Sequence, residues 1–263
     1  MFIDSHTHLT ELTIQNLEDM YLAGIRTVVS PVMFPSVVPV SSQTIQDVWD
    51  VQLDYQLHRA GEQLIKAYAM ICVTMVSIPK DPENLLKILP DYLDNPKVVA
   101  IGEIGFEPSS ETCGDLTIQE QIVKAQLKMA LEKDMPVVFH VPNPPELKEK
   151  FTARSLQLAE DAGLSMKRVL IDHCNEVNIE MVLQKGAFAG ISVQPWRNMT
   201  PELAADMVFK FGPDNIVINS DCSTEPSDPL AVARTSYALA RKGASDIVIE
   251  KVCHNNSKGF YGI

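Results

Sequence analysis

Residues 2–8 read FIDSHTH, a short apolar segment that runs into polar residues and two histidines. Phe2 and Ile3 favour a buried β-strand. His6 and His8 stand two residues apart on an extended segment, so their side chains point to the same side. Apolar segments of this kind recur along the chain, and each is followed by a longer amphipathic one. The opening stretch is therefore the first of a series of strand–helix units.

Eight such units follow one another without a linker or a change of composition. The predicted strands are 2–4, 25–31, 64–73, 98–103, 136–140, 168–173, 188–193 and 216–221. The predicted helices are 13–23, 42–62, 82–95, 117–134, 152–162, 178–185, 200–211 and 229–241. Strands that alternate with helices pair in parallel through right-handed crossovers. The pattern predicts one α/β domain over residues 1–263, folded as a (β/α)₈ TIM barrel. An open doubly wound sheet is the alternative, although no Gly-rich phosphate loop follows the first strand.

Charge and composition exclude several classes of protein. The 263 residues include 22 Lys and Arg against 34 Asp and Glu, a net charge of −12, and 46% are hydrophobic. A negative chain disfavours nucleic-acid backbones and anionic membrane surfaces, so a small-molecule substrate is expected. No apolar run is long enough to span a membrane, and the first residues are not expected to form a signal peptide. Five widely spaced cysteines without a CxxC pair predict free thiols in a reducing cytoplasm. The oligomeric state stays open.

Polar residues gather where the predicted strands end. In a TIM barrel these ends converge on one face, where active sites lie. The side chains that would meet there are His6, His8, Glu103, His140, His173 and Asp221. Imidazoles and carboxylates in this number suit two borderline divalent ions such as Zn²⁺ or Mn²⁺, and a carboxylate on the fourth strand can bridge them. Any single strand-end histidine has a structural alternative, but matching residues on five strand ends favour a metal site.

These motifs resemble the TatD-like family of metal-dependent hydrolases in the amidohydrolase superfamily. The matching pieces are FIDSHTH, GEIG at 102–105, VVFH at 137–140, IDHC at 171–174 and NSD at 219–221. The resemblance implies His6, His8, Glu103 and Asp221 at one metal, and Glu103, His140 and His173 at the other. Zinc is favoured, with manganese or magnesium as alternatives.

The resemblance also implies an activity. A metal-bound hydroxide would cleave an ester, amide or phosphoester bond, with Glu103 as the bridge and Asp221 as the group that takes up and returns the proton. The alternative is a metal-dependent 3'-5' exodeoxyribonuclease of the TatD type. A non-catalytic metalloprotein is a third possibility, but it would be expected to lack a ligand, and none is missing.

Departures from the family pattern bear on the substrate. Phe106-Glu107 stands where TatD nucleases read Leu-Asp, and Pro142 stands where they commonly carry Arg. Glu176 adds a negative charge after the sixth strand. The basic residues expected near the active face are then Arg197 and the stretch 148–150. These changes favour a small substrate over a nucleic acid.

Several further residues have two interpretations each. Asn175, Glu176 and Arg197 follow the sixth and seventh strands, so they are candidate substrate contacts, with helix capping or surface ion pairing as alternatives. Cys174 and Cys222 are predicted to fill space rather than bind metal. The apolar loop 32–40 is predicted to be a pocket wall or lid, with an oligomer contact as the alternative.

Overall fold

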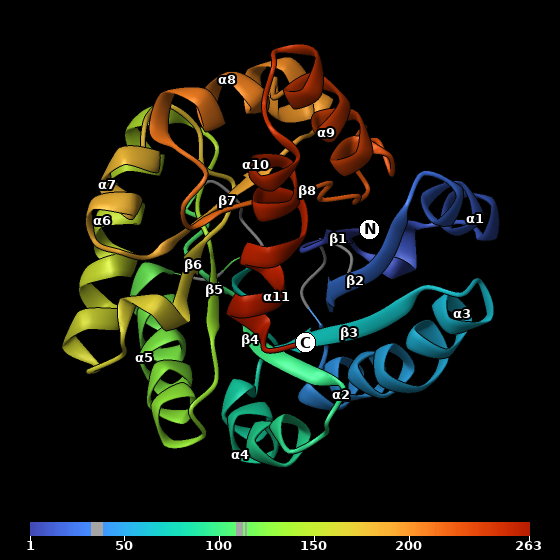
Figure 1. Cartoon of the computed structure of the whole chain (residues 1–263). Coiled ribbons are helices and arrows are strands. Elements are labelled where there is room, and N and C mark those ends of the chain that lie inside the picture. The colour runs from blue at the N-terminus through green and yellow to red at the C-terminus, as the bar shows by residue number, and fades with distance from the viewer. Residues whose placement is uncertain (33–38, 109–112, 114) are drawn as a thin grey trace.

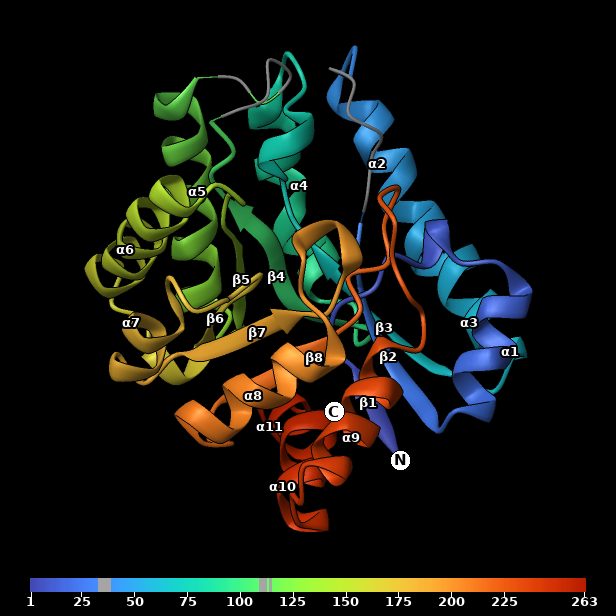
Figure 2. The ribbon, with the colours of Figure 1, turned by 90° about the horizontal axis from the view of Figure 1, so that it is seen from above.

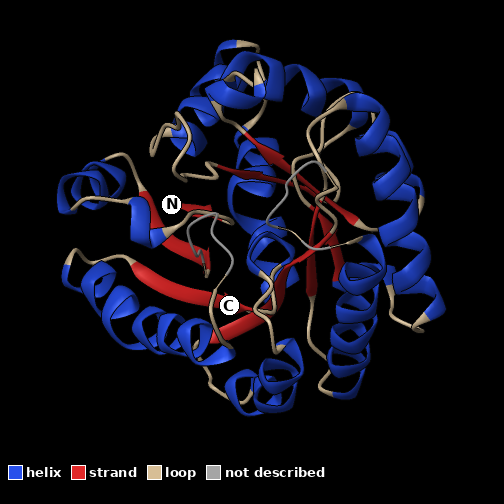
Figure 3. Ribbon diagram, turned by 180° about the vertical axis from the view of Figure 1, so that it is seen from behind, coloured by secondary structure: helices blue, strands red, loops and turns tan. Residues whose placement is uncertain are grey.

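The computed structural model describes residues 1–32, 39–108, 113 and 115–263. Eight strands pair in parallel in chain order, from the first to the last. They are β1 (Phe2–Asp4), β2 (Ile25–Pro31), β3 (Lys66–Ile71), β4 (Val98–Gly105), β5 (Val137–His140), β6 (Val169–Ile171), β7 (Phe188–Ser192) and β8 (Ile216–Asn219). The strands form the inner layer and the helices surround them (Figure 3).

Helices cover the outside of the strand ring and one of its ends. They are α1 (Ile14–Leu22), α2 (Ser42–Val51), α3 (Leu57–Glu62), α4 (Pro82–Leu93), α5 (Leu116–Glu132), α6 (Pro145–Asp161), α7 (Ile179–Gln184), α8 (Pro201–Phe211), α9 (Ala231–Arg241), α10 (Asp246–Glu250) and α11 (Asn256–Tyr261). Their apolar faces pack on the sheet. In α4, for example, Leu85, Leu89 and Leu93 are buried at helical spacing.

The first and last strands meet at the end of the barrel where the strands terminate. The backbone N–H of His8 donates to the carbonyl of Cys222 and that of Asp221 to the carbonyl of His6, both at 2.9 Å. The buried Asp4 carboxylate accepts the N–H of Ser220 at 3.0 Å. A doubly wound sheet reverses its strand order at a switch point. The sequential order and this junction therefore confirm the TIM-barrel prediction.

The interior of the barrel is filled with side chains. Met70, Val138 and Leu170 from the strands pack there with Phe260 and Tyr261 from α11. Figures 1 and 2 show α10 and α11 lying across the end of the barrel at which both chain termini are found. The C-terminal segment thus fills that end, and the site must open at the opposite one.

Two segments depart from the sequence prediction. Helix α6 begins at Pro145 rather than at residue 152, because proline is well tolerated in the first turn of a helix. Lys148, expected on a loop, consequently lies within α6 and is buried. Residues 246–261 form consecutive helical segments where no element was predicted. No helix among the described residues is both long and apolar enough to cross a membrane.

Candidate metal centre

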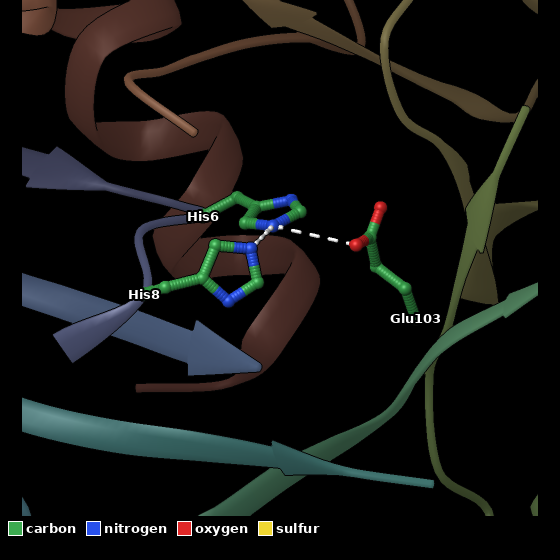
Figure 4. A group of neighbouring side chains, drawn as sticks. All are labelled: His6, His8 and Glu103. Atoms are coloured by element: carbon green, nitrogen blue, oxygen red, sulfur yellow. Dashed lines mark hydrogen bonds and ion pairs between the residues drawn. The ribbon is translucent and has the colours of Figure 1, made fainter. Parts of the chain in front are cut away.

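The structure brings the predicted metal ligands together at the C-terminal end of the strands. His6 and His8 follow β1, and Glu103 faces them from β4 across the barrel (Figure 4). His140 is the last residue of β5, and His173 and Asp221 lie just beyond β6 and β8. Glu103 lies two residues before the end of β4, His140 ends β5, and the other candidate ligands follow their strands by two residues, or four for His8. The sequence pattern located them because all lie near strand ends.

One group contains His6, His8 and Glu103. The Nε2 atom of His6 lies 3.3 Å from Nε2 of His8 and 3.6 Å from Oε2 of Glu103. Candidate ligand atoms of these residues all lie within 4.8 Å of one another. Asp221 borders this group, with Oδ1 at 3.6 Å from Nε2 of both histidines. The arrangement could hold one cation.

A second group contains Glu103, His140 and His173. Here the other carboxylate oxygen takes part, since Oε1 of Glu103 lies 2.9 Å from Nε2 of His173 and 3.5 Å from Nδ1 of His140. The two imidazole nitrogens are 3.1 Å apart. Glu103 therefore belongs to both groups and presents a different oxygen to each.

Asp172 fixes the orientation of two of these imidazoles, a role that the sequence pattern did not indicate. Its Oδ2 accepts from Nδ1 of His6 at 2.5 Å. Its Oδ1 accepts from Ser192 Oγ at 3.2 Å, and Ser192 Oγ in turn accepts from Nδ1 of His173 at 2.8 Å. In the neutral imidazoles this network places hydrogen on both Nδ1 atoms and leaves the Nε2 lone pairs facing Glu103. Carboxylates commonly hold metal-binding histidines in this way.

Glu107 plays a corresponding part at the remaining imidazole of the second group. Its Oε2 lies 3.3 Å from Nε2 of His140, so Nδ1 of His140 is directed toward Glu103. Nitrogen lone pairs and carboxylate oxygens, which are all acceptors, thus converge on the same space. Acceptors packed in this way repel one another unless a cation lies between them, and their chemistry fits divalent metal ions.

The pKa values reflect this concentration of charge. Burial acts to lower the pKa of His6, but the charges of Glu103 and Asp172 outweigh it and raise that pKa to about 10. Burial acts to raise the pKa of Glu103, yet the neighbouring histidines hold it well below its usual range. Burial and the guanidinium of Arg197 lower the pKa of His173 to about 4, which keeps it in the neutral form that binds metals.

Two of the site residues have unusual backbone conformations that surrounding contacts hold in place. His173 and Asp221 have φ of 57° and 43° in the left-handed region, which costs non-glycine residues energy. The buried Nζ of Lys148 donates to the carbonyl of His173 at 2.7 Å. Gln194 Nε2 donates to the carbonyl of Asp221 at 2.8 Å. Sequence periodicity gave no sign of Lys148, whose pKa burial lowers to about 8.

Gly190 on β7 makes room for the Asp172 carboxylate. A Cβ at this position would lie 2.3 Å from Oδ1 and 2.9 Å from Cγ of Asp172. We expect Gly190→Ala to lower the free energy of unfolding by about 1–3 kcal/mol, as overpacking does. Chemical denaturation measures this. Gly61→Ala is the matched control, because a Cβ at Gly61 meets nothing within 4 Å, and we expect a gain of roughly 0.5–1 kcal/mol there. Equal stability of Gly190→Ala and wild type would contradict the packing argument.

The predicted substrate contacts lie in different surroundings. Arg197 follows β7 and its Nε donates to Oδ2 of Asp221 at 3.1 Å. Asn175 Oδ1 accepts the N–H of Val177 at 3.0 Å, so it caps the local turn. The side chain of Glu176 is 75% exposed and lies 3.8 Å from Nζ of Lys210. The structure therefore brings Arg197, but not the other two, to the candidate metal ligands.

The remaining predictions concern the cysteines and one loop. All five cysteines are buried, and Cys72, Cys174, Cys222 and Cys253 are free thiols. Cys174 Sγ donates to the carbonyl of Ile171 at 3.2 Å, and neither Cys174 nor Cys222 belongs to a candidate metal group among the described residues. Of the loop 32–40, residues 33–38 lie outside the described residues.

A cavity of about 220 Å³ opens above the ligand cluster, and we call it the metal cavity. Besides the cluster, its walls come from the loops that follow several strands. These wall residues are Val32, Thr74, Met75, Val76, Gln194, Trp196, Arg197, Ser223, Thr224 and Glu225. The cavity therefore connects the acceptor-rich cluster with solvent through a lining that is partly apolar and partly polar.

A TIM barrel with histidine and carboxylate groups converging at its strand ends defines a metal-dependent hydrolase. The model of the family described as TatD related DNase matches residues 3–262. The chain belongs to this family.

Known relatives agree with this assignment. An uncharacterized metal-dependent hydrolase of Methanocaldococcus jannaschii is 28% identical over 259 residues, covering 98% of this chain and 99% of that protein. The TatD-like protein of Archaeoglobus fulgidus has a crystal structure with a TM-score of 0.81, 26% identity and full coverage of both chains. The phosphotriesterase homology protein of Escherichia coli, complexed with phosphate in its active site, has a TM-score of 0.72 and 16% identity, covering 99% of this chain and 98% of that one. This last likeness concerns the fold alone.

Proposed function

We propose that this hydrolase uses two divalent metal ions to cleave an ester, amide or phosphoester bond in a small molecule. His6, His8, Glu103 and Asp221 would hold one ion. Glu103, His140 and His173 would hold the other. Zinc is the favoured metal, and manganese or magnesium are alternatives. The observation that carries the proposal is the position of Glu103, whose two oxygens face two separate histidine groups.

The chain's own residues prepare the reaction. When bound, the metal ions would supply the Lewis acidity that polarises the scissile bond and acidifies water. Asp172 and Glu107 orient the imidazoles. Asp221 lines the metal cavity, and although burial raises its pKa, Arg197 and His8 hold that pKa well below its usual range. Asp221 is thus ionised and can accept a proton at its carboxylate and return it to a leaving group.

The dimensions of the site favour a small substrate. The metal cavity has a volume of about 220 Å³. Among its described wall residues, Arg197 is the single basic side chain of the Lys or Arg type. Nucleic-acid binding draws on several cationic contacts to phosphates. Asn175 and Glu176, also proposed as substrate contacts, line an adjoining cleft and would be reached by a substrate that extends there. We further propose that residues 1–263 act as one domain and, since Cys72, Cys174, Cys222 and Cys253 are free thiols, that the protein works in a reducing cytoplasm.

A DNase activity is the second candidate, because the family model is described as TatD related DNase. Assays of small substrates and of single-stranded DNA, run in parallel, distinguish the two activities. We expect the protein to hydrolyse one or more of a lactone, an amide, a phosphomonoester or a small phosphodiester, to lose that activity with EDTA and to regain it with Zn²⁺, Mn²⁺ or Mg²⁺. EDTA-sensitive degradation of single-stranded DNA at a higher kcat/KM than any small substrate would reverse the preference. Activity that survives complete metal removal would contradict the proposal as a whole.

A further inference from the structure

A depression separate from the cleft lined by Glu176 also adjoins the metal cavity, and we call it the side cleft. It has a volume of about 520 Å³ and lies between the loops that follow β4, β5, β6 and β7. Asn143, Asn175 and Asn198 supply neutral amides along its wall, and the Glu107 carboxylate, whose Oε2 lies 3.3 Å from Nε2 of His140, lines it as well. Trp196 and Arg197 line both the side cleft and the metal cavity, so they form the boundary between the two.

Arg197 is built rigidly into this boundary. It is the last residue of the 3₁₀ turn η5 (Pro195–Arg197), which Asn198 ends in a left-handed conformation with φ of 54°. Gln194, the residue before this turn, is buried. Its Nε2 donates to the Asp221 carbonyl at 2.8 Å and to Ser223 Oγ at 3.1 Å. The backbone of Arg197 is therefore fixed next to the ligand cluster.

The guanidinium is only partly used by the protein. Its side chain is 12% exposed and its Nε donates to Asp221. Within the part of the chain that the structure describes, its two terminal nitrogens have no hydrogen-bond partner. The guanidinium carbon also lies 5.2 Å from the ring centroid of Trp196, whose residue is 45% exposed. A largely buried guanidinium whose two terminal nitrogens are available can bind a planar carboxylate or a tetrahedral phosphate group.

Metal binding would strengthen this role. This inference rests on the proposed function. Two divalent ions at the ligand cluster would compete with Arg197 for the Asp221 carboxylate. A guanidinium beside those ions is repelled by them unless another anion comes between. An anionic group of the substrate meets that need.

We propose that Arg197 and the side cleft form an anion subsite, and that the substrate is a small ester or amide that carries a carboxylate or phosphate group. The anion binds the terminal nitrogens of Arg197. Neutral polar parts of the molecule contact the asparagine amides of the side cleft, and an apolar part lies against Trp196. Because the described residues of both cavities contain no second Lys or Arg, the subsite suits one anionic group rather than a chain of phosphates.

Binding to the metal-loaded protein tests the subsite without turnover. Benzoate, phenylphosphonate and the neutral benzamide are titrated by calorimetry into wild type, Arg197→Met, Arg197→Lys and Arg234→Met. Arg234 is the matched control, since it also ion-pairs with an aspartate, Asp228 at 2.7 Å, and it lines neither cavity. Elemental analysis gives the metal content of each variant.

We expect Arg197→Met to weaken the binding of at least one of the two anions by about tenfold or more. The affinity for benzamide should change much less, and the metal content should be unchanged. Which anion is affected tells a carboxylate substrate from a phosphate one. The affinity of Arg197→Lys for that anion should lie between those of wild type and Arg197→Met. Lysine keeps the positive charge but cannot form the paired hydrogen bonds of a guanidinium. Arg234→Met should match wild type. Unchanged binding of both anions by Arg197→Met, or a loss that follows loss of metal, would overturn the inference.

Turnover separates this inference from the proposed function. In wild type, kcat/KM should be higher for an anionic ester than for its neutral methyl ester, and Arg197→Met should reduce that ratio by about tenfold. Metal-dependent hydrolysis without any preference for the anionic ester would overturn the subsite and leave the proposed function standing. Absence of metal-dependent hydrolysis together with Arg197-dependent anion binding would overturn the proposed function alone.

Discussion

Asp221→Asn is expected to lower kcat by about two to four orders of magnitude while most of the metal stays bound. The amide can keep its oxygen near Nε2 of His6 and His8, while its NH2 group then takes the place of the Oδ2 that accepts from Nε of Arg197. It cannot take up a proton as a carboxylate does. The measurement is kcat on the best substrate of the panel together with elemental analysis of the same preparation.

The outcome of that substitution separates two roles for Asp221. Asp228→Asn is the control, because Asp228 pairs with Arg234 away from the ligand cluster and should keep wild-type kcat. Full activity of Asp221→Asn would refute the proton-transfer role. Loss of metal in parallel with loss of activity would show that Asp221 acts as a ligand and would also contradict the role proposed for it.

Glu103→Gln is expected to abolish measurable activity and to impair both metal groups at once. Glutamine offers one neutral oxygen where Glu103 presents Oε2 to His6 and Oε1 to His173. We expect metal affinity to fall by more than the roughly 10- to 100-fold that loss of an outer hydrogen-bond partner costs. Elemental analysis after dialysis measures this, and thermal unfolding reports whether the variant is folded.

A carboxylate outside the site provides the control for Glu103. Glu120→Gln removes a surface ion pair with Arg154, at 2.6 Å, and should leave metal content and activity at wild-type levels. A folded Glu103→Gln variant that keeps its full metal content would contradict the proposal that Glu103 contributes to both metal groups.

The convergence of the candidate ligands could be predicted from the sequence because each lies near the end of a buried strand. The apolar runs before Glu103, His140 and His173 marked where β4, β5 and β6 stop, and barrel topology then places those ends together. The prediction of a parallel barrel needed only the alternation of strand and helix. Neither inference required knowledge of side-chain contacts.

Residues that act through such contacts could not be predicted in this way. Asp172 orients His6 and His173 only because Gly190 leaves it space, and that space depends on a neighbouring strand. Lys148 lies on a helix whose proline-rich start looked like a loop. The C-terminal helices were missed because a π turn at 251–255 shifts the helical spacing of the apolar residues.

The metal content of single-group variants tests the two-metal centre most directly. Wild type, His8→Ala and His140→Ala are loaded with Zn²⁺, dialysed and measured by elemental analysis. His8 belongs to one group and His140 to the other, and Glu103 belongs to both. We expect two ions per chain in wild type and a value near one in each variant. A single ion in wild type, or loss of all metal from both variants, would contradict it.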